Sequence, residues 1–231
     1  MELGLQFEDI LCYEATAAIS SAHEESLETA IPEYCPDIAR IVEATGRLTI
    51  REKQLNEERC TISGSVKVTV LYTSEEATGL RSLTMSVPFS CVMDDRTLTR
   101  CGTVCAEGRV LLTEARAVTS RKLYIKVLPE ITAVGYRAVK RRLCTGTQEE
   151  STIRTQCRNV ELSLLTAISE KGFSFTDDVL LDDGCLPEDL LLHRMCPSIS
   201  SVQRLGNKLM IKGDMWSVSY THLRAHETVL D

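Results

Sequence analysis

Alternation of apolar and polar residues with a period of two dominates this chain and limits it to β-structure. The longest runs, in segments 60–72, 83–93 and 123–131, place apolar residues at nearly every second position. Alternation of this kind gives a strand one apolar and one polar face. Val160, Leu162 and Leu164 continue the pattern later in the chain. Long strands with one apolar face predict antiparallel sheets whose other face meets water.

Turn-forming residues separate these runs. The polar segment 73–79 ends in Gly79, and Asp94-Asp95-Arg96 follows the run that ends at Met93. Gly64 inside a strand indicates a bulge, and Pro88 favours an edge strand because proline has no N–H to donate.

One short helix is predicted to begin at Pro36. Proline suits the first position of a helix, and Asp37 would place negative charge at its positive end. Ile38, Ile41 and Val42 then follow at the spacing of a single apolar stripe. We expect this helix to cap one end of the sheets.

A pair of motifs occurs twice and predicts an internal duplication. Cys35-Pro36-Asp37-Ile38 followed by Ile62-Ser63-Gly64 recurs as Cys196-Pro197-Ser198-Ile199 followed by Ile211-Lys212-Gly213. The expected fold is all-β, an antiparallel sandwich-like module with a short capping helix, followed by a partial second copy. The predicted division is an N-terminal segment 1–24, a first module 25–145, a linker 146–159, a partial second module 160–217 and a tail 218–231.

The tail, residues 218–231, is predicted to be non-native. It resembles a translated sequencing-adapter read-through of the kind found at the ends of metagenome-derived proteins, so the natural chain would be interrupted near Trp216. His222 and His226 have the four-residue spacing of helical metal ligands, but they fall in this tail. We therefore predict no metal site from them.

Composition narrows the classes of partner and compartment. A net charge of −7 argues against nucleic-acid and anionic-membrane binding, because both need a basic face. The one basic cluster, Lys140-Arg141-Arg142, is interpreted as a solvated strand end. No basic leader and no apolar run of about 20 residues is visible, so we expect no signal peptide and no membrane insertion. Ten cysteines in 231 residues fall below the roughly 8–10% typical of short disulfide scaffolds. We expect structural thiols in a reduced, cytoplasmic protein.

Motifs for catalysis or cofactors are not recognisable. Cys101 and Cys105 could supply two zinc thiolates, but no second pair with ligand spacing follows. The acidic segment 177–184 lacks the alternate ligand spacing of a calcium loop. Nucleophile-elbow, phosphate-loop and dinucleotide motifs are also missing. We expect no enzyme activity, no catalytic residues, no cofactor and no metal.

Four segments in sequence order resemble the SPOCS domain of sporulation proteins, including spore-coat morphogenetic proteins of the SipL and SpoVID type. They are Pro36-Asp37-Ile38-Ala39-Arg40-Ile41-Val42, Ser63-Gly64-Ser65-Val66-Lys67-Val68-Thr69-Val70-Leu71-Tyr72, Pro88-Phe89-Ser90 and Arg121-Lys122-Leu123-Tyr124-Ile125-Lys126-Val127. The resemblance covers roughly residues 25–140, with a partial second copy over about 160–217.

The resemblance implies a β-rich module that is often tandem and frequently followed by a LysM module. It implies an adaptor that binds other spore coat morphogenetic proteins, including a coat ATPase. It also implies a place in the mother-cell cytoplasm, at the forespore surface or spore coat. Peptidoglycan contact would pass through a LysM module, which is not visible in this sequence.

Lys122, Tyr124 and Lys126 form the candidate protein-binding surface, since they share the polar face of one predicted strand. Sheet edges and the capping helix are further candidates, because an edge can pair with an extended peptide. A solvated strand face is the simpler interpretation of the same three residues. The alternative function is a carbohydrate- or peptidoglycan-binding β-module, against which the single Trp and four Phe argue.

Overall fold

The computed structural model describes residues 4–56, 59–76, 79–147, 161, 163–172, 174, 176, 178 and 190–221, and the backbone of 225–230. Strands make up most of this part of the chain, so the predicted all-β fold is confirmed. The elements are β1 (Leu5–Ala22), β2 (Glu25–Ala30), β3 (Arg40–Leu55), β4 (Cys60–Thr73), β5 (Leu80–Met93), α1 (Arg96–Thr99), β6 (Thr103–Thr119), β7 (Lys122–Thr147), β8 (Leu190–Leu205), β9 (Lys208–Thr221) and β10 (Ala225–Leu230).

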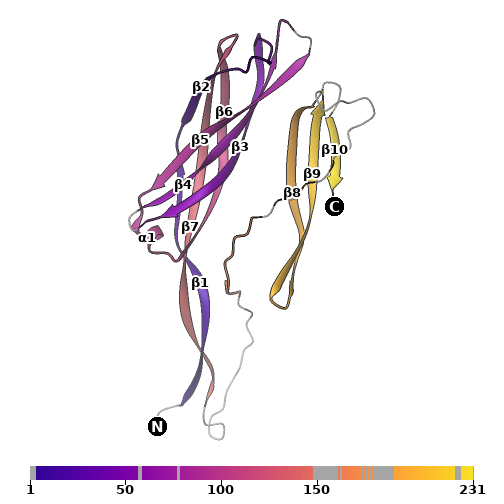
Figure 1. Cartoon of the computed structure of the whole chain (residues 1–231). Helices are drawn as coiled ribbons and strands as arrows, with labels where there is room; N and C mark the ends of the chain where they lie inside the picture. Colours follow the sequence, from indigo (N-terminus) through magenta and orange to yellow (C-terminus); the bar gives the residue numbers. More distant parts are fainter. Residues whose placement is uncertain are drawn as a thin grey trace.

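Two antiparallel sheets form a sandwich, and a third sheet follows it in sequence (Figure 1). In the first sheet, β7 pairs with β6 on one edge and with β1 and β2 in succession on the other. The second sheet has the order β3-β4-β5. The third has the order β8-β9-β10. All of these pairings are antiparallel, as the alternating sequence predicts.

The core of the sandwich consists of the apolar residues that alternate along β4, β5 and β7. Ile62 of β4 and Ile125 of β7 are fully buried, and Val87 of β5 is almost so. Burying one such side chain contributes about 1.5–3 kcal/mol. The buried cluster comprises Cys60, Ile62, Val66, Val68, Val70, Val87, Phe89, Cys91, Met93, Leu98, Ile125, Val127, Ile131 and Ala133.

Two prolines of the sandwich lie at positions where the sheet does not require a backbone N–H, the group that proline lacks. Pro88 is in β5, which pairs with β4 alone among the described strands, so the predicted edge position is confirmed. Pro129 is inside β7, opposite the break between β1 and β2. The sequence predicts a bulge at Gly64, but the structure has it in the partner strand. β3 has a register shift just after Ile50, the residue that pairs with Gly64.

The helix predicted at Pro36 is wrong. Residues 31–39 form a loop, and β3 begins at Arg40. The N–H of Ile38 donates to Ser120 O at 2.9 Å, and that of Ala39 donates to Thr73 O at 2.9 Å. These tertiary bonds take the N–H groups that a helix would pair with its own carbonyls. The helix in the described residues is instead α1, where Asp95 Oδ1 accepts from Thr97 N at 2.6 Å.

The helix predicted in the second copy is also wrong, because Cys196, Pro197, Ile199 and Val202 all lie in β8. The short strand predicted at residues 160–164 does not form at Leu164, which is exposed and outside any strand. Val160 and Leu162 lie outside the described residues.

A two-stranded ribbon extends from the sandwich, built from the start of β1 and the end of β7 (Figure 1). The segment predicted as 1–24 thus contributes β1 to the first sheet. The basic cluster at residues 140–142 lies on this ribbon, where Arg141 pairs with Glu14 and the Arg142 guanidinium carbon lies 4.4 Å from the centroid of the Phe7 ring. Among the described residues, no helix is long and apolar enough to cross a membrane.

Candidate interaction surface

The three predicted binding residues lie on the outward face of β7. Lys122, Tyr124 and Lys126 alternate with Leu123 and Ile125, which are fully buried. The strand therefore turns its apolar side to the core and these three side chains outward, as the sequence predicts.

Each of the three side chains is held by a neighbour. Lys122 pairs with Glu28, and Lys126 Nζ lies 2.6 Å from Glu24 Oε2. The hydrogen bond to Glu24 raises the pKa of Lys126. The Arg116 guanidinium carbon lies 4.5 Å from the centroid of the Tyr124 ring, a cation–π distance. The charges of Lys122 and Lys126 are thus paired with carboxylates, and Tyr124 lies beside a guanidinium.

A concavity of about 650 Å³ adjoins this face. Tyr124 and Lys126 line it, whereas Lys122 does not. Its walls come from β3 at residues 41–44 and from β6 at residues 113–116, and they carry charges of both signs. Ile41, Val42, Glu43, Ala44, Thr113, Glu114, Ala115 and Arg116 complete the lining.

The concavity lies at one end of a seam between the two sheets, which we call the β3–β6 seam. Among the described strands, β3 pairs with β4 alone and β6 with β7 alone, so each has one edge without a strand partner. Lys53 of β3 crosses the seam and donates from Nζ to the carbonyl oxygen of Val104 in β6 at 3.1 Å. The alternation in the sequence could not predict this seam. A period of two determines which face of a strand a side chain occupies, but it does not determine which strand edges lie next to each other.

Two glycines bring the edges together along the seam. A Cβ added at Gly46 of β3 would lie 2.5 Å from Thr113 Oγ1 of β6. A Cβ added at Gly108 of β6 would lie 2.5 Å from Leu48 Cδ2 of β3. Near residues 41–44 the ladder between β3 and β4 shifts by one residue, and Val42 is exposed. A bulge of this kind bends an edge strand locally.

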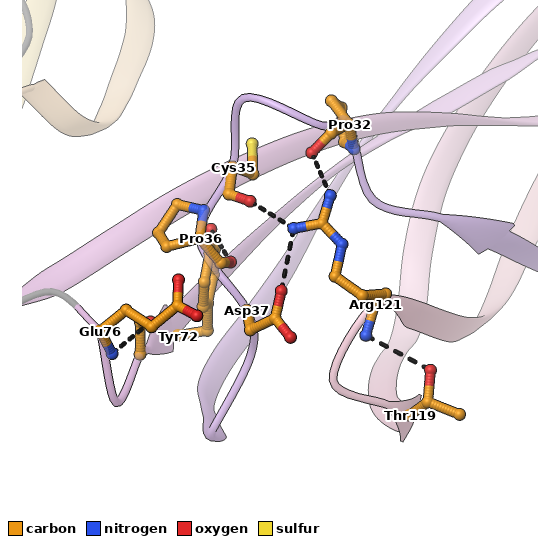
Figure 2. A network of polar contacts seen from close by, with 9 residues as sticks. Pro32, Cys35, Pro36, Asp37, Tyr72, Glu76, Thr119 and Arg121 are labelled. Carbon is orange, nitrogen blue, oxygen red and sulfur yellow. Dashed lines mark hydrogen bonds and ion pairs between the residues drawn. The ribbon is translucent and has the colours of Figure 1, made fainter.

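A clasp around Arg121 fixes the loop that leads into β3 (Figure 2). Arg121 Nη1 donates to Cys35 O at 2.6 Å and to Asp37 Oδ1 at 3.0 Å, and Nη2 donates to Pro32 O at 3.0 Å. Hydrogen bonds from the side chains of Ser120 and Arg121 lower the pKa of Asp37. The clasp ties loop 31–39 to the turn between β6 and β7.

The clasped loop presents Tyr34 to solvent and buries other side chains. Ile31, Cys35 and Ile38 are buried against Tyr72 and other residues at the end of the sandwich. Tyr34 is 87% exposed. An exposed tyrosine on a fixed loop resembles the aromatic anchors of protein interfaces. Sequence reasoning did not single out Tyr34, which lies just before the helix predicted to begin at Pro36.

Nothing in the described part of the chain forms a group of His, Cys, Asp or Glu residues able to hold a metal ion. Cys101 is a buried free thiol, and its sulfur lies 2.9 Å from Thr16 Oγ1. The two predicted tail histidines and most of the acidic segment 177–184 have no described side-chain environment.

Comparison with known proteins gives one family. Residues 37–114 match the family described as SipL, SPOCS domain, which confirms the resemblance found in the sequence. No curated protein and no solved structure matches the chain. The matched segment runs from Asp37 through β3, β4, β5 and α1 into β6 and ends at residue 114. It includes the β3 wall of the concavity and Thr113 and Glu114 of the β6 wall, but not Ala115, Arg116, Lys122, Tyr124 or Lys126.

Proposed function

The chain carries a SPOCS domain of the SipL type, and from this premise we propose that it is an adaptor that binds other spore coat morphogenetic proteins. The family is one of non-catalytic sporulation proteins with a role in coat assembly. We place the adaptor in the mother-cell cytoplasm, at the forespore surface. A coat ATPase is among the partners we propose.

The concavity at the β3–β6 seam is the observation that carries this proposal. It is bounded by two sheet edges that have no strand partner among the described strands, and the family match covers the β3 edge and the β6 edge as far as Glu114. Such edges can accept an extended peptide by main-chain hydrogen bonds, with nearby side chains giving selectivity. Tyr124 and Lys126 stand at its rim with Arg116 and Glu114, so the partner segment we propose is an extended strand with charges of both signs.

The test is affinity purification of the tagged chain from sporulating cells of a spore-forming host, followed by mass spectrometry. We expect coat morphogenetic proteins with the parent chain, and at least a tenfold loss with the double variant Tyr124→Ala/Lys126→Glu. Lys140→Glu is the matched control, because it makes the same charge change on an exposed position of the ribbon. Equal recovery with both variants would exclude this surface, and recovery of glycan alone would overturn the adaptor function.

A further inference from the structure

The hairpin β8–β9 repeats the hairpin β3–β4 at a constant spacing. Ile50 pairs with Gly64 in the first hairpin, and Ile199 pairs with Gly213 in the second. Each residue of the second pair lies 149 positions after its counterpart (199 minus 50, and 213 minus 64). This spacing differs from the one that aligns the two Cys-Pro steps, which places Cys196 opposite Cys35.

The irregularities of the two hairpins repeat at the same spacing. β3 has register shifts between Ile41 and Glu43 and between Ile50 and Glu52. β8 has them between Leu190 and Leu192 and between Ile199 and Ser201. Bulges are specific features of a ladder, so two of them at one spacing are strong support for a common structure.

The paired glycines have the same steric reason. A Cβ added at Gly64 would lie 2.1 Å from Thr49 O, and one added at Gly213 would lie 2.3 Å from Ser198 O. In each hairpin the backbone of the partner strand, just before the bulge, takes the space of a side chain. Only glycine allows this approach.

Part of the face that forms the core in the first hairpin is exposed in the second. The exposed part lies near Ile211, whereas Ser217, Ser219 and Thr221 farther along the same face are buried. Ile62 and Cys60 are 0% and 1% exposed, whereas their counterparts Ile211 and Leu209 are 61% and 67% exposed. In the first module this face packs against Ile125, Val127 and Ile131 of β7 and against partly buried residues of β6. Nothing described covers the equivalent face near Ile211.

A second observation indicates that a strand equivalent to β7 belongs to this part of the chain. Ala167-Ile168-Ser169 lies 149 positions after Ala18-Ile19-Ser20 of β1 (167 minus 18). In the first module β1 pairs with β7. The described residues 163–172 belong to no strand, and most are exposed. Leu165 O of this segment accepts from Tyr13 N of β1 at 2.7 Å. Among the described residues no β7-like strand pairs with segment 163–172 or covers the β8–β9 face near Ile211, and one such strand would account for both.

Near Thr221 the face becomes polar. Ser217, Ser219 and Thr221 stand where β4 has Val68, Val70 and Tyr72. Ser219 and Thr221 lie in the tail predicted to be non-native, whereas Ser217 precedes it, so the apolar part of this face ends at Met215. The edge of β9 that corresponds to the β5 edge of β4 pairs with β10.

We propose that β8–β9 is the β3–β4 hairpin of a second SPOCS module, and that its exposed apolar face binds a β6–β7-like strand pair. We assign that pair to sequence of the natural protein that follows Trp216. In the first module β6 and β7 follow β4 in the chain, and the same order would bring the pair to this face. The pair needs alternate apolar residues, like Leu123, Ile125 and Val127 of β7.

The test extends the chain according to the 149-residue spacing. A copy of residues 68–147 is placed directly after Trp216, in place of residues 217–231. We expect amide hydrogen exchange in 163–172 and 199–215 to slow at least tenfold relative to the parent chain, since both segments gain β7-like partners. The matched control carries Ile125→Asp and Val127→Asp in the added copy only, and its exchange in these segments should stay fast.

Two results would overturn the proposal. One is fast exchange in 163–172 and 199–215 of the extended chain. The other is a dimer of the parent chain, seen by light scattering, that Ile211→Asp converts to monomer, because the face would then bind a second copy. A monomeric parent together with slowed exchange supports the proposal, and neither result depends on which partner the β3–β6 seam binds.

Discussion

Arg121 and Asp37 form an ion pair across 84 positions of sequence, with Nη1 3.0 Å from Oδ1. The pair joins the turn between β6 and β7 to the loop before β3. Arg121 also donates to the carbonyl oxygens of Pro32 and Cys35. One side chain thus satisfies two loop carbonyls and one carboxylate.

Removing the clasp should loosen loop 31–39 without unfolding the sandwich. We expect Arg121→Ala to lower the free energy of unfolding by about 1–2 kcal/mol, since the clasp is only partly buried and water can replace some of its bonds. Urea denaturation measures this loss. Arg51→Ala, at an exposed position of β3, is the control and should cost under about 0.5 kcal/mol. Equal losses for the two variants would contradict a clasp.

Stability should fall in acid through Asp37. Hydrogen bonds from Ser120 and Arg121 lower the pKa of Asp37 below its usual value of 3.8. A carboxyl with a lowered folded-state pKa stabilises the fold fully above pH 3.8, and this contribution is lost as pH falls through the lowered value. Asp37→Asn should therefore reduce stability at pH 7 and flatten its dependence on pH below 3.8. Urea midpoints measured for both proteins from pH 2 to pH 7 check this, and parallel curves would refute it.

Gly64 should tolerate no larger residue. A Cβ there would lie 2.1 Å from Thr49 O, which is backbone and can move only if the β3–β4 ladder moves. We expect Gly64→Ala to cost more than about 2 kcal/mol, as overpacking against a fixed neighbour does. Gly102→Ala is the control because a Cβ there meets nothing within 4 Å. Thermal unfolding of the two variants is the measurement. A loss of stability confined to Gly64→Ala indicates close packing, whereas equal losses would indicate a general effect of alanine.

How far sequence alone predicts this structure can be judged from particular residues. The inward positions of β4, β5 and β7 were predictable, because Ile62, Val87 and Ile125 each fall in a run of period two that only a half-buried strand explains. The segment from Pro36 to Val42 led to a wrong prediction. The spacing of its apolar residues suits a helix, but backbone hydrogen bonds to Ser120 and Thr73 hold the segment extended. Helix propensity is a property of the local sequence, and tertiary hydrogen bonds can override it.

The candidate site was only half predictable for a related reason. Alternation placed Lys122, Tyr124 and Lys126 on one outward face, which the structure shows. It could not predict that β3 and β6 meet, since no sequence period records which edges face each other. Gly46 and Gly108 were the signal for that approach, but a glycine in a strand indicates close packing without naming the neighbour.

Chain length should affect solubility. A version that ends at Gly146 keeps the sandwich but lacks the third sheet, with its exposed Ile199, Leu209 and Ile211. Exposed apolar strands promote association. We expect the full chain to aggregate at lower concentration than the shorter version, as measured by light scattering over a concentration series. Equal onset concentrations would show that the third sheet adds no such tendency.

The two hairpins should respond differently to the same substitution at equivalent positions. Ile62→Ala removes a fully buried side chain from β4, and such deletions cost about 2–5 kcal/mol. Ile211→Ala, 149 positions later (211 minus 62), changes a side chain that is 61% exposed, so we expect under about 0.5 kcal/mol. In the chain extended after Trp216, the cost of Ile211→Ala should rise above about 1 kcal/mol, because the added strands bury it. Denaturant unfolding of five proteins gives this comparison: the parent chain, its Ile62→Ala and Ile211→Ala variants, the extended chain and the extended chain with Ile211→Ala. If Ile211→Ala costs the same in both chains, the added strands do not cover this face, whereas a rise confined to the extended chain identifies it as the core face of a second sandwich.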